Sequence, residues 1–244
     1  MKECSKSIAR RLRDPNFARF YFRGDGVDIG GKPDPLTLYT ELFPAIQSIK
    51  VWDLEDGDAQ FMAGVPDETF DFVHSSHCLE HLHDAAEGLA NWLRILKPGG
   101  FMIVMIPDED LYEQGVFPST LNRDHKATFT IFKDRSWSPV SRNVLDLLRG
   151  LGPTARVEKV ELLTGSYRFD LPRFDQTLTP IGECGIEFIV RKAGAEEAST
   201  GARARTTAQP PADLRIHYNQ YRDDTRRLKS GNDAAPPFQN TDEL

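Results

Sequence analysis

Four short groups of residues have the types and spacing to do chemistry at the ends of predicted strands. The first is Asp28-Ile29-Gly30-Gly31, which combines an acid with two glycines at the end of a short apolar stretch. Glycine lets a ligand approach the backbone, and an acid at the carboxyl edge of a parallel sheet binds polar groups of that ligand. The pattern differs from GxGxxG, and a purely structural turn explains it equally well.

Two further groups suit a nucleoside. Asp53 ends a second predicted strand 23 residues after Gly30, a position from which a carboxylate accepts hydrogen bonds from a ribose diol. The alternative is a turn-capping acid, and Glu55 and Asp56 compete for the ribose role. The short acidic turn Gly57-Asp58-Ala59 follows, where an adenine amino group would find a partner.

The fourth group is a histidine-rich turn. His74 and Ser75 end a predicted buried strand, and His77-Cys78-Leu79-Glu80-His81 comes next. The second stretch matches HxxEH, an inverted zinc-peptidase pattern with two histidine ligands and a general-base glutamate. Here the stretch follows a strand directly and no third ligand stands out, so we predict neither zinc hydrolysis nor a metal site.

The elements that must position these groups are strands of a parallel sheet. The pattern predicts a buried strand over 70–74, an amphipathic helix over 84–96 and a continuously apolar strand over 101–106. A strand, a helix and a strand joined by tight turns make a βαβ unit. Outside this unit we predict strands at 26–29, 48–53, 156–163 and 185–191, a brief element at 57–61, and helices within 1–23, 36–46 and 141–151.

The block from residue 25 to 108 resembles the class I S-adenosylmethionine-dependent methyltransferases, in the branch that includes ubiquinone-biosynthesis-type enzymes (methyltransferase type 11). Four motifs in register carry the resemblance: Gly57-Asp58-Ala59, then PDETFDFV at 66–73, Leu79-Glu80-His81-Leu82, and RILKPGG at 94–100. Two departures are Lys32, where the family usually has a second loop glycine, and the short stretch between Asp53 and Asp58.

The resemblance implies a fold, a cofactor and a set of binding residues. The fold would be a Rossmann-like, doubly wound α/β domain whose seven-stranded, mostly parallel sheet has an antiparallel last strand at 185–191. The cofactor would be S-adenosyl-L-methionine. Its methionine and ribose would lie along Asp28, Gly30 and Gly31, its ribose hydroxyls on Asp53, its adenine by Asp58 and Ala59, and its sulfonium beside His74 and Ser75.

Composition divides the chain into three predicted parts. We expect an N-terminal helical lid segment at 1–24, a methyltransferase domain at 25–193, and a flexible tail at 194–244, rich in Ala, Thr, Gly, Arg and Pro. Basic residues gather in the first part, and we interpret them as a solvated helix face rather than an anion site. They are Arg10, Arg11, Arg13, Arg19 and Arg23.

Charge and cysteine content narrow the class of partner. A net charge of −7 opposes nucleic-acid binding over the whole surface. Three widely spaced cysteines, no apolar leader and no long apolar run favour a cytoplasmic protein without membrane contact. We expect a monomer or a homodimer.

The predicted reaction is methyl transfer to an oxygen or nitrogen of a small-molecule or glycan acceptor. A long polar and aromatic segment at 107–136 leaves the carboxyl edge of the sheet, where it is placed to recognise that acceptor. His77 and His125 are the candidate catalytic bases, because an imidazole titrates near neutrality. A noncatalytic binding module is the alternative, supported by Lys32, and a nicotinamide-dependent enzyme is disfavoured because GxGxxG is missing.

Overall fold

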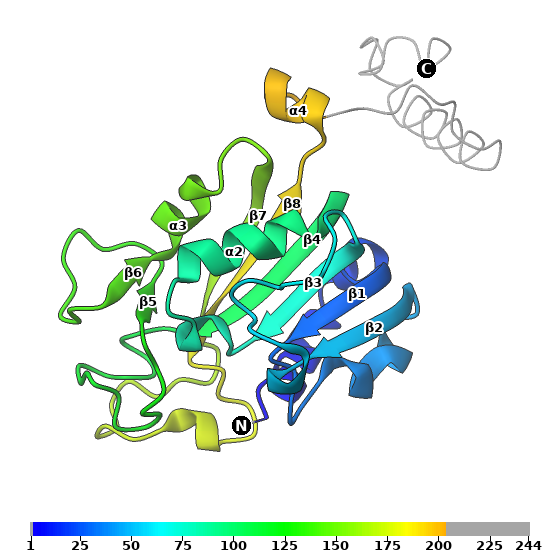
Figure 1. Cartoon of the computed structure of the whole chain (residues 1–244). Coiled ribbons are helices and arrows are strands. Elements are labelled where there is room, and N and C mark those ends of the chain that lie inside the picture. The colour runs from blue at the N-terminus through cyan, green and yellow to red at the C-terminus, as the bar shows by residue number, and fades with distance from the viewer. Residues whose placement is uncertain (1, 204–244) are drawn as a thin grey trace, which may run out of the picture. The chain divides into compact units, whose positions relative to one another are not determined.

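The computed structural model describes residues 2–203, and the predicted tail from residue 204 onward lies outside the described residues. Its centre is a six-stranded sheet in the order β2-β1-β3-β4-β8-β7 (Figure 1). The strands are β1 (Gly24–Ile29), β2 (Ile46–Trp52), β3 (Phe70–Ser76), β4 (Leu96–Pro107), β7 (Ala155–Leu163) and β8 (Gly185–Lys192).

The predicted fold class is confirmed, and the predicted strand number is corrected. β2, β1, β3 and β4 are parallel, and β8, the last strand, runs antiparallel to both of its neighbours. This sheet has six strands rather than seven. The brief element expected at 57–61 is a series of turns after the short helix η3 (Leu54–Asp56), because Gly57 at φ +122° and the acids around it cap turns instead of extending the chain.

Apolar residues of the central strands alternate between two cores. On β4, Met102 and Val104 pack into one core, while Ile103 packs into the other. On β8, Phe188 and Ile189 divide in the same way. A strand covered on both faces has to be apolar at successive positions, which is why 101–106 reads as a continuous apolar run.

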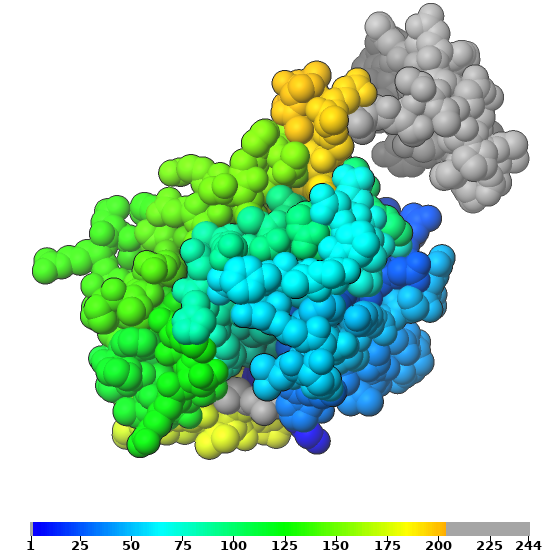
Figure 2. Space-filling model, in the orientation of Figure 1, coloured from blue at the N-terminus to red at the C-terminus, as the bar shows by residue number. Residues whose placement is uncertain are grey.

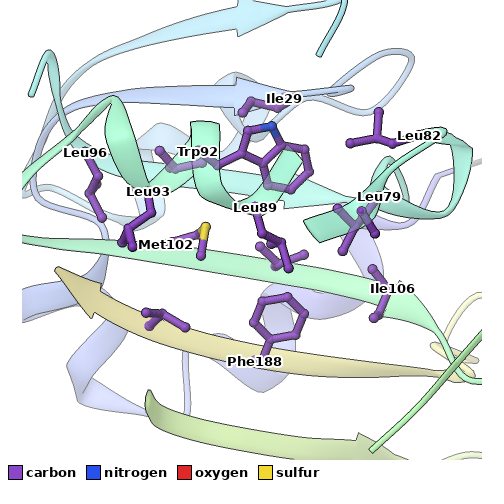
Figure 3. Close-up of a cluster of buried hydrophobic side chains, with 14 of the residues drawn as sticks. Ile29, Leu79, Leu82, Leu89, Trp92, Leu93, Leu96, Met102, Ile106 and Phe188 are labelled. Carbon is purple, nitrogen blue, oxygen red and sulfur yellow. The ribbon is translucent and has the colours of Figure 1, made fainter. Parts of the chain in front are cut away.

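Helix α2 (Ala85–Arg94) covers the first face. It starts where the side chain of Asp84 accepts hydrogen bonds from the N–H groups of Ala86 and Glu87, a standard N-cap. Its buried residues include Leu89 and Leu93, which lie over β4, and Trp92, whose ring lies beside Ile29 of β1 (Figure 3). Helix α3 (Val144–Gly150) adds to this layer, although the strand β6 (Ser141–Asn143) occupies the predicted first turn of that helix and pairs with β5 (Thr128–Thr130).

The second face is covered by the N-terminal elements α1 (Cys4–Arg11), η1 (Phe17–Tyr21) and η2 (Leu36–Leu42). Cys4, Ile8 and Phe17 are core residues of this layer. Residues up to 202 form one compact unit, and the lid assignment for 1–24 stays a prediction. Helix α4 (Ala195–Thr200) lies where the tail was expected to begin, and its Glu197 pairs with Arg191.

The interpretation of the arginines as a solvated face is wrong for two of them. Arg13, Arg19 and Arg23 are exposed, but Arg11 is fully buried and Arg10 pairs with Glu187. The antiparallel strand β8 places Glu187 beside α1, and the pattern of α1 alone does not reveal that neighbour. None of the helices among residues 2–203 is long and apolar enough to cross a bilayer.

Candidate functional site

Two adjoining cavities lie where the parallel strands end. The inner cavity has a volume of about 180 Å³ and the outer cavity about 440 Å³, and Gly30 and His81 line both. The N-terminus, the segment after β4 and the segment after β7 gather at this edge of the sheet (Figure 1). In the space-filling view, the green and yellow segments border the blue and cyan N-terminal half here (Figure 2).

The turn after β1 requires both of its glycines. Gly30 has φ +70°, and a Cβ there would lie 2.7 Å from the Cβ of Cys78. A Cβ on Gly31 would lie 2.5 Å from Oδ2 of Asp28. The turn therefore brings bare backbone to the junction of the two cavities, a place where a ligand can approach closely.

Asp53 lines the outer cavity and also caps η3. Its Oδ1 accepts from the N–H of Leu54 at 2.8 Å, and its Oδ2 accepts from the N–H of Lys32 at 3.1 Å. A carboxylate has about four acceptor positions, so both oxygens keep capacity for a ligand. The Lys32 ammonium pairs with Glu55, and the backbone of Lys32 supports Asp53.

Two tryptophans hold the acidic turn next to Asp53. The indole N–H of Trp52 donates to the carbonyl of Gly57 at 3.0 Å, and that of Trp92 donates to the carbonyl of Ala59 at 2.8 Å. Asp58 accepts from the N–H of Gln60 at 2.8 Å and lines the outer cavity with Ala59. The structure thus brings Asp53, Asp58 and Ala59 together, as the sequence predicted.

Two predicted residues, Asp28 and His74, belong to the arginine cluster, which we define as Arg10, Arg11, Asp28, His74 and Glu187. β1 and β3 pair Asp28 directly with His74, and Oδ1 of Asp28 lies 2.6 Å from Nδ1 of His74. Nη1 of Arg11 lies 2.9 Å from Nε2 of His74. Arginine only donates, so Nε2 accepts and the imidazole proton lies on Nδ1, donated to Asp28.

Every carboxylate of the arginine cluster accepts hydrogen bonds. Oδ2 of Asp28 accepts from the N–H of Leu36 at 2.7 Å, and Glu187 accepts from Arg10 at 2.7 Å and from Arg11 at 3.0 Å. Burial alone would raise the pKa of Glu187, but Arg11 and Arg10 outweigh it and lower that pKa to about 2. Asp28 and His74 also line the inner cavity, so they form a rigid wall with committed polar atoms.

Ser75 does not join the other predicted residues. Its hydroxyl is buried and donates to the carbonyl of Ile29 at 3.0 Å, and it lines neither cavity. The next residue, Ser76, lines the inner cavity instead, and its Oγ is buried without a hydrogen-bond partner in the described part of the chain. Successive strand residues face opposite ways, so a shift of one position exchanges these roles.

Four further lining residues of the inner cavity, together with Glu113 behind His125, form the histidine cluster, which we define as His77, Glu80, His81, Glu113 and His125. His77 directly follows β3 with φ +57°, a conformation that non-glycine residues rarely adopt. Its Nδ1 lies 3.3 Å from Oε1 of Glu80. Burial alone would lower the pKa of His77, but Glu80 raises it above the usual value.

His125 reaches this cluster from the segment after β4. The N–H of Lys126 donates to the carbonyl of Glu80 at 2.8 Å, which docks the segment on the turn at residues 79–81. Nδ1 of His125 lies 2.7 Å from Glu113, and its ring lies near those of His81 and Tyr112, at centroid distances of 5.1 and 5.2 Å. The structure therefore brings the two predicted catalytic residues, His77 and His125, to one cavity.

Other polar residues of the 107–136 segment differ in location. Tyr112 and Asn122 line the inner cavity and Asp124 lines the outer one. Glu109 lines neither cavity. It is buried and accepts hydrogen bonds from four side chains that hold the segment together: Thr128, Lys133, Ser136 and Ser141.

One residue of the inner cavity gave no signal in the sequence. Glu3 is buried, its Oε1 pairs with Lys6 at 2.8 Å, and its Oε2 lies 3.9 Å from Nε2 of His77. Neither Oε2 nor that Nε2 has a hydrogen-bond partner among residues 2–203. Its contribution depends on the docking of α1, which the local sequence does not encode.

The fold, with its nucleoside-sized cavity at the glycine turn, defines a Rossmann-like α/β protein that binds a ligand at the carboxyl edge of its sheet. Residues 12–147 match the family model described as a methyltransferase domain. Since the match spans more than half of the chain, the chain belongs to this methyltransferase family, and S-adenosylmethionine is its methyl donor.

Comparison with other proteins gives weaker likenesses. No curated protein matches the sequence. Similar solved structures include S-adenosylmethionine-dependent methyltransferases from Archaeoglobus fulgidus and Clostridium acetobutylicum. The first is 21% identical, covers 76% of this chain and 92% of its own, and has a TM-score of 0.46. The second is 13% identical, covers 78% and 92%, and has a TM-score of 0.48.

The residues present fit the methyl donor. The outer cavity offers Asp53 with free acceptor capacity beside the turn that contains Asp58 and Ala59, and Gly30 leaves room for a ligand to continue into the inner cavity. The alternative of a noncatalytic binding module was supported only by Lys32 in the glycine turn, and the structure removes that support. The backbone N–H of Lys32 supports Asp53, and the lysine thereby preserves the turn.

Proposed function

We propose that the chain transfers a methyl group from S-adenosylmethionine to an oxygen or nitrogen of a small polar acceptor bound in the inner cavity. The observation that supports this proposal most directly is the location of the inner cavity. It adjoins the outer cavity at Gly30 and His81, and carboxylates and imidazoles line it. Acceptors that donate hydrogen bonds, such as amines, sugars and other hydroxyl compounds, suit this lining better than carboxylic acids do.

The proposed assignment of the donor follows the two cavities. Asp53 would hold the ribose hydroxyls, Asp58 and Ala59 the adenine, and the Gly30-Gly31 backbone the methionine part beside Asp28 and His74. Once bound, the donor supplies an activated methyl carbon on a sulfonium. The protein then has to align the acceptor and exclude water, and alignment alone contributes up to roughly 7–11 kcal/mol in well-oriented reactions.

We propose different roles for the two catalytic candidates. His77 lines the inner cavity, and its buried Nε2 has no hydrogen-bond partner in the described residues. It is our candidate to accept the acceptor's proton. His125 has its Nδ1 on Glu113, so only its Nε2 is available on the cavity side, and we propose that it positions the acceptor.

A small buried cavity also supports the view that the acceptor is not nucleic acid. Only a fragment of a polymer would enter a space of about 180 Å³. We propose a small molecule or a single sugar unit as the acceptor, and we retain monomer or homodimer as the proposed assembly.

The test combines donor binding with product detection. Calorimetry with S-adenosylhomocysteine should show binding that Asp53→Ala weakens about 10- to 100-fold, since a hydrogen bond to a charged group contributes roughly 1.5–3 kcal/mol. Glu55→Gln is the matched control, because Glu55 lines neither cavity and should leave this affinity unchanged. Equal weakening by both substitutions would contradict the assignment of Asp53.

Turnover is then measured with a panel of amines, sugars, phenols and carboxylic acids, with product mass read directly. With the acceptor that reacts, His77→Ala should lower kcat by roughly 10²–10⁴-fold while S-adenosylhomocysteine affinity stays unchanged. Unchanged kcat in this variant would rule out His77 as the proton acceptor. A donor that binds without any methylated product from the panel would count against the proposed acceptor classes.

A further inference from the structure

Glu80 is a fully buried carboxylate with neither oxygen satisfied. Its exposed fraction is 0%, and no donor among residues 2–203 makes a hydrogen bond to Oε1 or Oε2. Its neighbours are imidazoles. Nδ1 of His77 lies 3.3 Å from Oε1, and Nε2 of His81 and of His125 each lie 3.9 Å from it. A buried carboxylate that has only imidazoles as neighbours is expensive unless one of them is protonated or a further cation joins it.

Two of these imidazoles direct lone pairs toward Glu80. Nδ1 of His81 lies 2.9 Å from Oδ2 of Asp124 and 3.3 Å from the carbonyl oxygen of the same residue. Nδ1 of His125 lies 2.7 Å from Oε1 of Glu113. These oxygens accept, so each Nδ1 carries a proton, and the Nε2 of each ring is the atom that can offer a lone pair to a metal ion. A carboxylate behind each imidazole is the usual arrangement around histidine ligands of metals.

The spacing suits a metal ion. One ligand atom each from Glu80, His81 and His125 lies within 4.8 Å of the others. A cation about 2.1 Å from each atom would hold them roughly 3.0–3.4 Å apart, so the distances from the carboxylate would shorten by less than about 1 Å. Two histidines and one carboxylate leave further coordination positions open. All three residues line the inner cavity, together with Tyr112 and Asn122.

We propose that Glu80, His81 and His125 bind a divalent transition-metal ion of the zinc or manganese type, whose open positions face the inner cavity. This part of the proposal rests on the proposed function: the ion would hold an oxygen or nitrogen of the methyl acceptor. This set differs from the HxxEH zinc-peptidase pattern. There the ligands would be His77 and His81 with Glu80 as base, whereas here Glu80 is a ligand and His125 replaces His77.

The metal site is tested by binding alone. The full chain, free of affinity tag and treated with a chelator, is titrated calorimetrically with ZnCl₂ and with MnCl₂, and the visible absorption of added Co²⁺ reports the coordination geometry. We expect saturable binding of a single ion. Glu80→Gln and His125→Ala should abolish it, and Glu113→Gln should weaken it about 10- to 100-fold, as loss of a partner behind a ligand does.

His83→Ala is the control, because His83 is an exposed histidine two residues from His81 and outside the proposed ligand set. It should bind the ion as the unchanged chain does. Absence of saturable binding for all three ions, or equal loss in His83→Ala and Glu80→Gln, would overturn the metal site. Folding of each variant is checked by circular dichroism. If His125→Ala unfolds, the metal affinity of Glu113→Gln still tests the site.

The acceptor contact is tested separately by turnover. Loss of turnover on chelation and its return with the added metal would support a metal-held acceptor. Equal turnover by the metal-free and metal-loaded chain would overturn that contact. A bound ion with no methylated product would support the metal site and count against the proposed function, so the two failures are distinguishable.

Discussion

The arginine cluster and the histidine cluster both contribute residues to the lining of the inner cavity, and they differ in how their carboxylates are satisfied. In the arginine cluster, Glu187 and Asp28 accept hydrogen bonds from Arg10, Arg11, His74 and the backbone of Leu36. In the histidine cluster, Glu80 is equally buried but accepts none in the described residues. Burial of charge is therefore a structural feature where the partners are internal, and a sign of a ligand where they are missing.

The two clusters also bind different parts of the fold together. Arg11 lies between the rings of Phe17 and Phe22, with its guanidinium 5.4 and 5.6 Å from their centroids, and joins α1 to β3 and β8. The histidine cluster joins the turn after β3 to the segment around residue 125. The first cluster stabilises the residues beside which the donor is proposed to lie, and the second is proposed to present groups to the acceptor.

The largest expected effect comes from breaking the arginine cluster. Glu187→Gln leaves the buried Arg11 guanidinium without its anion, and loss of one partner of a buried pair destabilises by about 3–5 kcal/mol. Urea unfolding measures the change. Glu161→Gln is the control, since Glu161 pairs with Glu187 in register but is partly exposed, and it should cost about 0–1 kcal/mol. Similar losses of unfolding free energy in Glu187→Gln and Glu161→Gln would contradict the special role of the buried ion pair.

The stabilisation by Glu187 should also depend on pH. The folded pKa of Glu187 is about 2, below its ordinary value of 4.5, so its stabilisation is complete above pH 4.5 and is lost as pH falls toward 2. The difference in free energy of unfolding between the original chain and Glu187→Gln should shrink steadily over this window. Urea unfolding at pH 6, 4 and 3 measures it, and a constant difference would contradict the role of charge.

The smallest effect on stability is expected from the matching change in the histidine cluster. In the metal-free chain, Glu80→Gln removes a buried carboxylate that accepts no hydrogen bond from residues 2–203. Against the cost of burial, only the nearby imidazoles, His77 first, hold the pKa of Glu80 below its usual value, so the free energy of unfolding should fall by less than in Glu187→Gln. The measurement is urea unfolding with chelator present. A loss as large as that of Glu187→Gln would show that the imidazoles already satisfy Glu80, as the arginines satisfy Glu187.

Much of the fold could be predicted because its signals are local. The apolar run over 101–106, the helix ending before Lys97 and the turn at Gly57-Asp58-Ala59 each lie in one short stretch, and they appear in the structure at or near those positions. The expectation of a seventh strand was wrong for the described residues, because resemblance to a family supplied it and the stretch after Asp53 forms η3 and turns instead.

The candidate site was predicted less evenly. Asp53, Asp58 and Ala59 come together because each follows the end of β2 closely in the chain. Ser75 was assigned in place of Ser76, since the sequence does not determine which side chain at a strand end faces the ligand. Glu3 could not be predicted, because α1 carries it to the cavity through packing between distant parts of the chain.

By itself, the sequence determined the class of this protein, the order of β1, β2, β3, α2, β4, β7 and β8, and the glycine and acidic turns that are proposed to bind the donor. These depend on residue types and spacing over short distances. Tertiary structure alone decided which charges are satisfied. It buried Arg11 against Glu187 and brought His125 to Glu80, because β8 returns antiparallel beside α1 and the backbone of Lys126 docks on the turn after β3.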